Sequence, residues 1–175
     1  MKEEFKIIAD SIEREKSILD VGCGDGELMK FIYENISKKI RGLEISKDNV
    51  QKCIKKGLTV IEGNAEMDLQ QFPSNSFDYV ILSQTLQAFL NPEKVISDLL
   101  RIGKTSIVTI PNFGFWKVRF NFSNDFISGP DSLGSITSAS LLLCTIYEKL
   151  SFKHFIISTF IIFLLKKYQV QKLNF

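Results

Sequence analysis

The sequence contains few of the residues that build disulfide frameworks and metal centres. Its 175 residues include three cysteines, one histidine and four prolines. The cysteines, Cys23, Cys53 and Cys144, are odd in number, lie far apart and form no C-x-x-C pair. This pattern predicts a reduced compartment, with neither a disulfide framework nor a zinc site.

Long hydrophobic runs are also missing. The one strongly apolar run, residues 155–165, has eleven positions and includes Ser158 and Thr159, whereas a membrane-spanning helix needs about 20 residues. The N-terminal segment 1–16 mixes acidic and basic residues and lacks the apolar stretch of a secretion signal. We therefore expect a cytoplasmic protein with no membrane span, in which residues 155–165 form a buried strand.

Charge of one sign is not in excess. Lys and Arg number 22 against 20 acidic residues, which gives a formal net charge of +2. The basic residues are scattered rather than gathered into a stripe, which argues against nucleic-acid binding. Hydrophobic residues make up 45% of the chain and charged residues 24%, a composition typical of a globular protein with a packed core.

Helix and strand patterns alternate along the first two thirds of the chain. Phe5, Ile8 and Ile12 share one face of a helix expected over 3–14. The expected strands are 17–21, 40–45, 58–62, 77–83 and 105–110, and the expected helices between them are 27–36, 47–56 and one that starts at Asn91 and Pro92. This alternation predicts an α/β fold with a Rossmann-like, doubly wound, mostly parallel sheet. Ligands of such sheets bind beyond the carboxyl ends of the strands.

The first expected strand ends in a glycine-rich turn. The stretch ILDVGCGDGEL places Gly22, Gly24 and Gly26 between this strand and the next helix. Glycines there can take positive φ and let a ligand approach the main chain at the helix N-terminus, although a tight turn without a ligand is the alternative. A dinucleotide fingerprint would require glycine at position 27, which is Glu27.

Acidic residues surround this turn. Asp20 and Asp25 flank the glycines, and their charges would repel a pyrophosphate but suit a cationic ligand with sulfonium and ammonium groups. Glu44 ends the second expected strand, where an acid can accept hydrogen bonds from both ribose hydroxyls of an adenosine. Together these residues predict a site for S-adenosylmethionine, with a solvated surface acid as the alternative for Glu44.

Residues after the third and fourth expected strands are further candidates. Asn64 and Ala65 would meet the adenine edge, although Asn64 suits a simple turn equally well. Ser83 is a candidate near the ligand, with a helix cap as the alternative. No catalytic side chain is predicted, because methyl transfer from a sulfonium needs mainly an in-line approach of the acceptor. His154, the one histidine, is expected to be a structural or surface residue rather than a general base, and no metal ligand is assigned.

From Ile18 to about Arg119 the chain resembles the MetW family, methyltransferase-fold proteins linked to methionine biosynthesis. The stretches that carry the resemblance are ILDVGCGDGELMKFI, RGLEISKDNVQKCIKKGLTVIEGNAE, FPSNSFDYVILSQTLQAFLNPEKV and IPNFGFWKVRF. The resemblance implies the class I methyltransferase fold, with S-adenosylmethionine bound at Asp20, the three glycines and Glu44. It also implies partnership with homoserine O-acyltransferase.

The C-terminal third departs from the family pattern. The family has a T-P-N-I-H-like stretch before L-C-T-I, whereas this chain has SASLL at 138–142, without the histidine. We expect a single domain over 1–175, with a cofactor-binding half at 17–111, a loop or lid at 112–140, and a divergent, incomplete C-terminal segment at 141–175. Three hypotheses stay open: a cofactor-binding partner of the acyltransferase, a methyltransferase acting on a small molecule, and a degenerate remnant without function.

Overall fold

The computed structural model describes residues 3–111, 153–156 and 160–166, and side-chain packing is described for residues 4–110. The strands are β1 (Ile18–Val21), β2 (Ile40–Glu44), β3 (Val60–Glu62), β4 (Phe77–Ser83), β5 (Gly103–Pro111), β6 (Lys153–Ile156) and β7 (Phe160–Lys166). The helices are α1 (Glu3–Asp10), α2 (Glu27–Asn35), α3 (Lys47–Lys55), α4 (Ala65–Asp68) and α5 (Pro92–Ile102). In these ranges no helix is long and apolar enough to cross a membrane.

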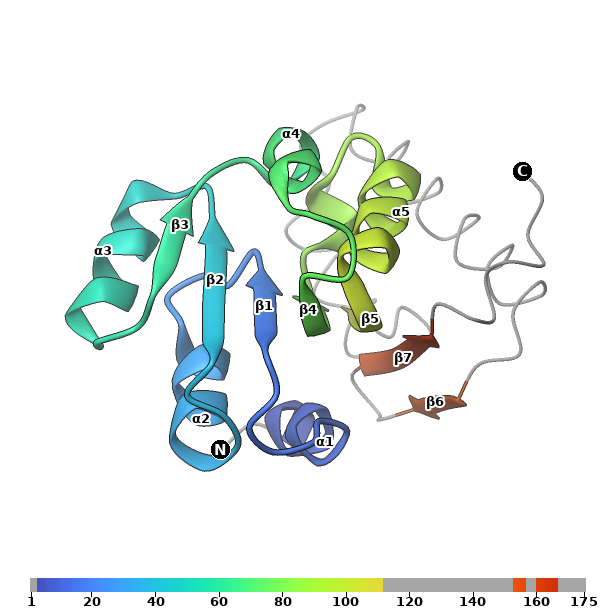
Figure 1. The fold of residues 1–175 in the computed structure, drawn as a ribbon, viewed down its shortest axis with the longest axis horizontal. Coiled ribbons are helices and arrows are strands. Elements are labelled where there is room, and N and C mark those ends of the chain that lie inside the picture. Colours follow the sequence, from blue (N-terminus) through green and yellow to red (C-terminus); the bar gives the residue numbers. More distant parts are fainter. Residues whose placement is uncertain (1–2, 112–152, 157–159, 167–175) are drawn as a thin grey trace, which may run out of the picture.

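The described strands form one sheet in the order β3-β2-β1-β4-β5-β7-β6 (Figure 1). Strands β1 to β5 run parallel to one another, which confirms the predicted doubly wound, mostly parallel sheet. Strand β7 runs antiparallel to β5 and to β6. The prediction of a single strand over 155–165 is therefore wrong, because this run is divided between two strands, β6 and β7, that pair with each other. The C-terminal segment thus contributes both strands at one edge of the sheet.

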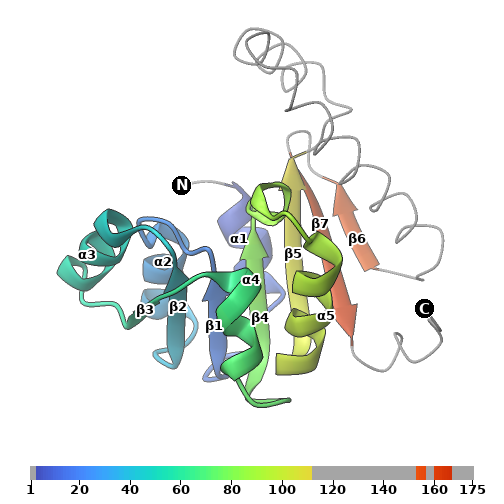
Figure 2. The same ribbon diagram turned by 90° about the horizontal axis from the view of Figure 1, so that it is seen from above.

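Apolar layers cover the two faces of the sheet. Helices α1 and α2 lie on one face and α4 and α5 on the other, as Figure 2 shows. Alternate residues of β1 divide between these layers: Ile18 packs with Ile8 of α1 and Met29 of α2, whereas Leu19 packs with Leu99 of α5. The period-2 alternation of a strand thus lets one buried strand serve two cores.

Local signals set the ends of most elements. Asn91 caps α5, since its side chain accepts a hydrogen bond from Lys94 N at 3.1 Å. Gly57 follows α3 with a φ of +76°, the left-handed conformation expected for a helix C-terminus. Strand β3 begins at Val60 rather than at Leu58, because Leu58 N still donates to Cys53 O of α3.

Helix α1 is shorter than the expected helix over 3–14. It ends at Asp10, where Ser11 N bonds both Ile7 O and Ile8 O. The next amide, of Ile12, bonds Ala9 O. These i→i+3 bonds tighten the last turn and end the helix.

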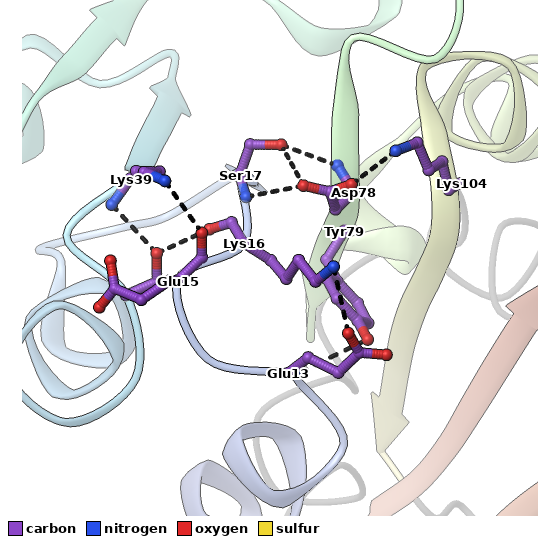
Figure 3. Close-up of polar contacts among 9 residues, drawn as sticks. Glu13, Glu15, Lys16, Ser17, Lys39, Asp78, Tyr79 and Lys104 are labelled. Atoms are coloured by element: carbon purple, nitrogen blue, oxygen red, sulfur yellow. Dashed lines mark hydrogen bonds and ion pairs between the residues drawn. The ribbon is translucent and has the colours of Figure 1, made fainter.

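The amino ends of β1, β4 and β5 are joined by a polar network around Asp78 (Figure 3). Asp78 Oδ2 accepts hydrogen bonds from Ser17 N at 3.0 Å and from Ser17 Oγ at 2.8 Å. Its other oxygen, Oδ1, pairs with Lys104 Nζ at 2.7 Å. The bond from Lys104 is the main reason that the pKa of Asp78 lies well below its usual range, and the bonds from Ser17 lower it further. This network lies at the end of the sheet opposite the glycine turn.

We expect Asp78→Asn to lower the free energy of unfolding by about 1 to 2 kcal/mol at pH 7, because charge-assisted hydrogen bonds to a half-buried group are lost. Since folding lowers this pKa, the stabilisation is present above the unfolded-state pKa of about 3.9 and is lost as the pH falls below it. Urea unfolding at several pH values measures this. Glu34→Gln, which removes an exposed ion pair with Lys30, is the control; an equal effect of both variants would contradict the prediction.

Candidate functional site

The turn after β1 brings main chain without side chains to the carboxyl end of the sheet. Gly22, Gly24 and Gly26 have φ values of +68°, +58° and +80°, the left-handed region that glycine tolerates. A Cβ on Gly22 would lie 2.7 Å from Thr85 Cγ2, and one on Gly26 would lie 2.8 Å from Cys53 Sγ. A Cβ on Gly24 would meet nothing within 4 Å. Gly22 and Gly26 thus allow close packing against protein, whereas Gly24 borders open space.

Glu44 points toward this turn. Its side chain is 7% exposed, accepting hydrogen bonds from Gly24 N at 2.8 Å through Oε2 and from Ser46 N at 2.9 Å through Oε1. A solvated surface acid, the alternative considered for Glu44, does not fit this burial. Because a carboxylate has about four acceptor positions, two remain for other donors such as ribose hydroxyls.

Asp20 is a buried acid that forms no hydrogen bond within the part of the chain that the structure describes. It is 1% exposed, and neither carboxyl oxygen has a hydrogen-bond partner in the described residues. Burial, and to a lesser extent the charge of Glu44, raise the pKa of Asp20 to about 8. An unpaired buried carboxyl is costly for folding, and such groups gather at functional sites. A cationic ligand next to Asp20 would remove this cost.

Asp25 does not share this environment. It forms an ion pair with Lys56 at 3.0 Å, and the hydrogen bond from Lys56 is the main reason that its pKa is lowered. The position of Asp25 in the sequence predicts that it acts with Asp20 on a cationic ligand. This prediction is wrong for Asp25, because Lys56, just after α3, already compensates its charge.

The remaining predicted site residues have local partners. Asn64 caps α4, with its Oδ1 accepting from Glu66 N at 2.9 Å, and Ala65 is the buried first residue of that helix. Ser83 Oγ donates to Glu4 Oε1 at 3.0 Å. The structure therefore gives Asn64 a role in the turn, which was the alternative to ligand binding. Contacts of Asn64, Ala65 and Ser83 with a ligand stay predictions.

Two further residues at this end of the sheet were not predicted from the sequence. Ile45 directly follows Glu44 and is 65% exposed, which gives the site an apolar surface suited to the face of a planar base. Thr85 packs against Gly22 and donates to Ser83 O at 2.7 Å. Ile45 could be found from the sequence, because it is an apolar residue directly after an acid at a strand end. Thr85 could not, because its place depends on packing between β1 and the loop after β4.

This strand order and the glycine turn define a class I methyltransferase fold. A SAM-dependent methyltransferase from Thermotoga maritima superposes with a TM-score of 0.64 at 18% identity, over 94% of this chain and 87% of that chain. A SAM-dependent methyltransferase from Aquifex aeolicus superposes with a TM-score of 0.61 at 16% identity, over 93% and 88%. At these identities the likeness shows the fold alone.

The chain belongs to the MetW family. The model of the family described as methionine biosynthesis protein MetW matches residues 2–167. The chain is 31% identical over 123 residues to the bifunctional methionine biosynthesis protein MetXA/MetW of Rhodopirellula baltica, which is 66% of this chain and 20% of that protein. It is 28% identical over 135 residues to the demethylmenaquinone methyltransferase of Listeria welshimeri, which is 69% of this chain and 56% of that protein. The chain therefore spans less than two thirds of either relative.

We expect Asp20→Asn to stabilise the ligand-free protein at pH 8 by about 1 to 3 kcal/mol, because it removes the cost of a buried, unpaired charge. Folding raises the pKa of Asp20 from about 3.9 to about 8, so the wild type loses stability relative to the variant as the pH rises through this range. Urea unfolding of both proteins at pH 5 and pH 8 measures the difference. A difference that does not grow between these two pH values would contradict the prediction.

Proposed function

We propose that this chain binds S-adenosylmethionine at the carboxyl ends of β1 and β2, and that it acts with homoserine O-acyltransferase in methionine biosynthesis. The observation that carries the first part is the Asp20 carboxyl, which is buried without a hydrogen-bond partner among the described residues, next to a glycine turn that borders open space. A neutral ligand would leave this acid uncompensated. A ligand that carries a sulfonium and an ammonium group would compensate the charge of Asp20.

The residues present suit the parts of this ligand. Glu44 would accept the ribose hydroxyls, with its carboxylate already oriented by two main-chain amides. Ile45 would pack on the adenine, and the open side of Gly24 would leave room for the ligand against the main chain. S-adenosylmethionine, when bound, supplies a methyl group on a positively charged sulfur. The protein's own contribution is to hold the ligand, to compensate its charge and to exclude water.

The partnership is supported by the family and by one relative. In Rhodopirellula baltica a MetW-like part belongs to a single bifunctional chain named MetXA/MetW. Two domains joined in one chain have a high effective concentration toward each other, which favours contact between domains that act together. Because S-adenosylmethionine is made from methionine, occupancy of this site would report the level of the pathway's product to the acyltransferase.

A methyltransferase acting on a small molecule is the second candidate. It is supported by the similarity to a demethylmenaquinone methyltransferase over 69% of this chain. Radiolabelled methyl transfer to cell metabolites separates the two functions, since a partner that only binds the ligand transfers no label. A degenerate remnant would bind no S-adenosylmethionine.

We expect Gly24→Ala to weaken binding of S-adenosylmethionine by about tenfold or more, because the methyl group takes space needed for close approach of the ligand. Gly57→Ala is the matched control: this glycine also has positive φ and open space around its Cα, but it lies at the far end of α3. Both variants should lose about 1 to 2 kcal/mol of stability. Calorimetric titration measures the affinities; equal affinities of the two variants would overturn the assignment of the site.

For the partnership, we expect the chain to co-elute with the homoserine O-acyltransferase of the same organism and to change its rate of acetyl transfer. Added S-adenosylmethionine should alter this rate with the wild type and not with Gly24→Ala, because only the wild type binds the ligand. Size-exclusion chromatography and a coupled acetyl-transfer assay measure both effects. Absence of association together with an unchanged rate would exclude the partnership.

A further inference from the structure

Helix α1 is fixed to the sheet by a buried carboxylate, Glu4. Glu4 is 2% exposed. Its Oε1 accepts hydrogen bonds from Ser83 Oγ at 3.0 Å and from Thr109 Oγ1 at 2.7 Å, and its Oε2 accepts one from Gln84 Nε2. Ser83 and Thr109 are partners in the register of β4 and β5. The N-terminal helix therefore docks at the carboxyl ends of these two strands.

Gln84, the first residue after β4, has a left-handed backbone. Its φ of +57° is unfavourable for a residue that carries a Cβ atom, and such a conformation persists only where the surroundings impose it. The N–H of Gln84 donates to Thr109 O and to Thr109 Oγ1, both at 3.1 Å. Its C=O accepts from Gln87 Nε2, and its side chain is held by Glu4. The contact with Glu4 is the one that comes from α1, an element outside the sheet.

The next residue, Thr85, contacts the glycine turn. A Cβ on Gly22 would lie 2.7 Å from Thr85 Cγ2 and 2.9 Å from Thr85 Oγ1, so the threonine side chain lies directly against the main chain of Gly22. Thr85 Oγ1 also donates to Ser83 O at 2.7 Å. A different φ at Gln84 would move Thr85 relative to Gly22, because the two residues are adjacent in the chain. The conformation of Gln84 thus sets the contact between the loop after β4 and the glycine turn.

The bond between Glu4 and Gln84 goes beyond what docking of α1 requires. The hydroxyl groups of Ser83 and Thr109 already bind the Glu4 carboxylate, and neither residue has a positive φ. Hydrogen bonds to a carboxylate are strong enough to hold a helix without a strained partner. The third bond joins Glu4 to a residue whose backbone is strained, and strained residues gather where a particular conformation serves function.

We propose that Glu4 is a positioning residue of the ligand site, which holds Gln84 in its left-handed conformation and so keeps the loop after β4 against the glycine turn. The inference rests on the proposed function, because the glycine turn is where an adenosyl ligand would bind. Glu4 acts through Gln84 and needs no contact with the ligand. The docking of α1 and the affinity of the site are therefore linked: an undocked helix releases Gln84, and a bound ligand favours the docked helix by the same factor.

The test compares two substitutions of Gln84 that both remove its bond to Glu4. Gln84→Met keeps a Cβ and a side chain of similar length, so the left-handed conformation becomes unfavourable once the bond to Glu4 is lost. Gln84→Gly loses the same bond, but glycine takes positive φ without strain. Calorimetric titration with S-adenosylmethionine measures the affinities. Glu15→Met is the matched control, because Glu15 also has a positive φ, +60°, but is exposed and precedes β1 at the amino end of the sheet.

We expect Gln84→Met to weaken binding by about tenfold, the factor that corresponds to the penalty of a left-handed conformation for a residue with a Cβ, and Gln84→Gly to stay within about threefold of the wild type. The control variant should bind as the wild type does. An affinity of Gln84→Gly no higher than that of Gln84→Met would overturn the proposal, as would an equal loss in Glu15→Met. A wild type that does not bind S-adenosylmethionine fails the proposed function, whereas a wild type that binds it no better than both Gln84 variants confines the failure to Glu4 and Gln84.

A second comparison addresses Glu4 itself. Glu4→Ala should weaken binding by about the same tenfold factor, and the addition of Gln84→Gly should restore most of the affinity, because glycine at position 84 needs no bond to Glu4. A structural role of Glu4 predicts no such rescue, since the bonds to Ser83 and Thr109 stay lost in the double variant. Unchanged binding by Glu4→Ala, or a loss without rescue, would overturn the proposal. Circular dichroism checks folding; should Glu4→Ala not fold, the two Gln84 variants, which keep Glu4, decide the question.

Discussion

The carboxyl end of the sheet depends on one residue, Glu44. Its side chain accepts hydrogen bonds from the amides of Gly24, in the turn after β1, and Ser46, at the start of α3. Its main-chain oxygen accepts from Gly63 N, just after β3, at 2.9 Å. The ends of β1, β2 and β3 are thus held together through a single position. Hydrogen bonds to a buried carboxylate are among the stronger ones in proteins, so the turn is fixed in shape before any ligand arrives.

This fixed geometry exists at a cost in stability. Asp20 and Glu4 are buried at 1% and 2% exposure, where transfer of a charge from water is expensive. The apolar layers on both faces of the sheet offset this cost, because β1 and β4 contribute buried side chains to each layer. Stability is thus provided by the middle of the sheet and by the polar network at its amino end. The carboxyl end of the sheet holds the buried acids Asp20 and Glu4, which lower stability until their charge is compensated.

Much of this arrangement could be predicted from the sequence, because the signals are local. The glycine turn follows an apolar strand directly, Asn91 and Pro92 start a helix, and Gly57 ends one; each depends on residues within a few positions. Contacts between distant residues could not be predicted. The pairing of Asp25 with Lys56 joins residues 31 positions apart, and that of Glu4 with Thr109 joins residues 105 positions apart. Neither follows from periodicity or spacing, so the sequence indicates neither the compensated charge of Asp25 nor the role of Glu4 in docking α1.

The placement of these acids bears on how the site differs from a general nucleotide site. Methyl transfer converts a positively charged sulfonium into a neutral thioether, so under the proposed function the buried acids would favour the ligand before transfer over the ligand after it. An enzyme uses this preference to release its product, whereas a regulatory partner uses it to distinguish the two forms. A regulatory role requires a helix or loop whose docking on the protein depends on the charge of the ligand. Under the proposed function helix α1 would be such an element, because Glu4, which anchors it to β4 and β5, forms no ion pair with a lysine or arginine in the described part of the chain.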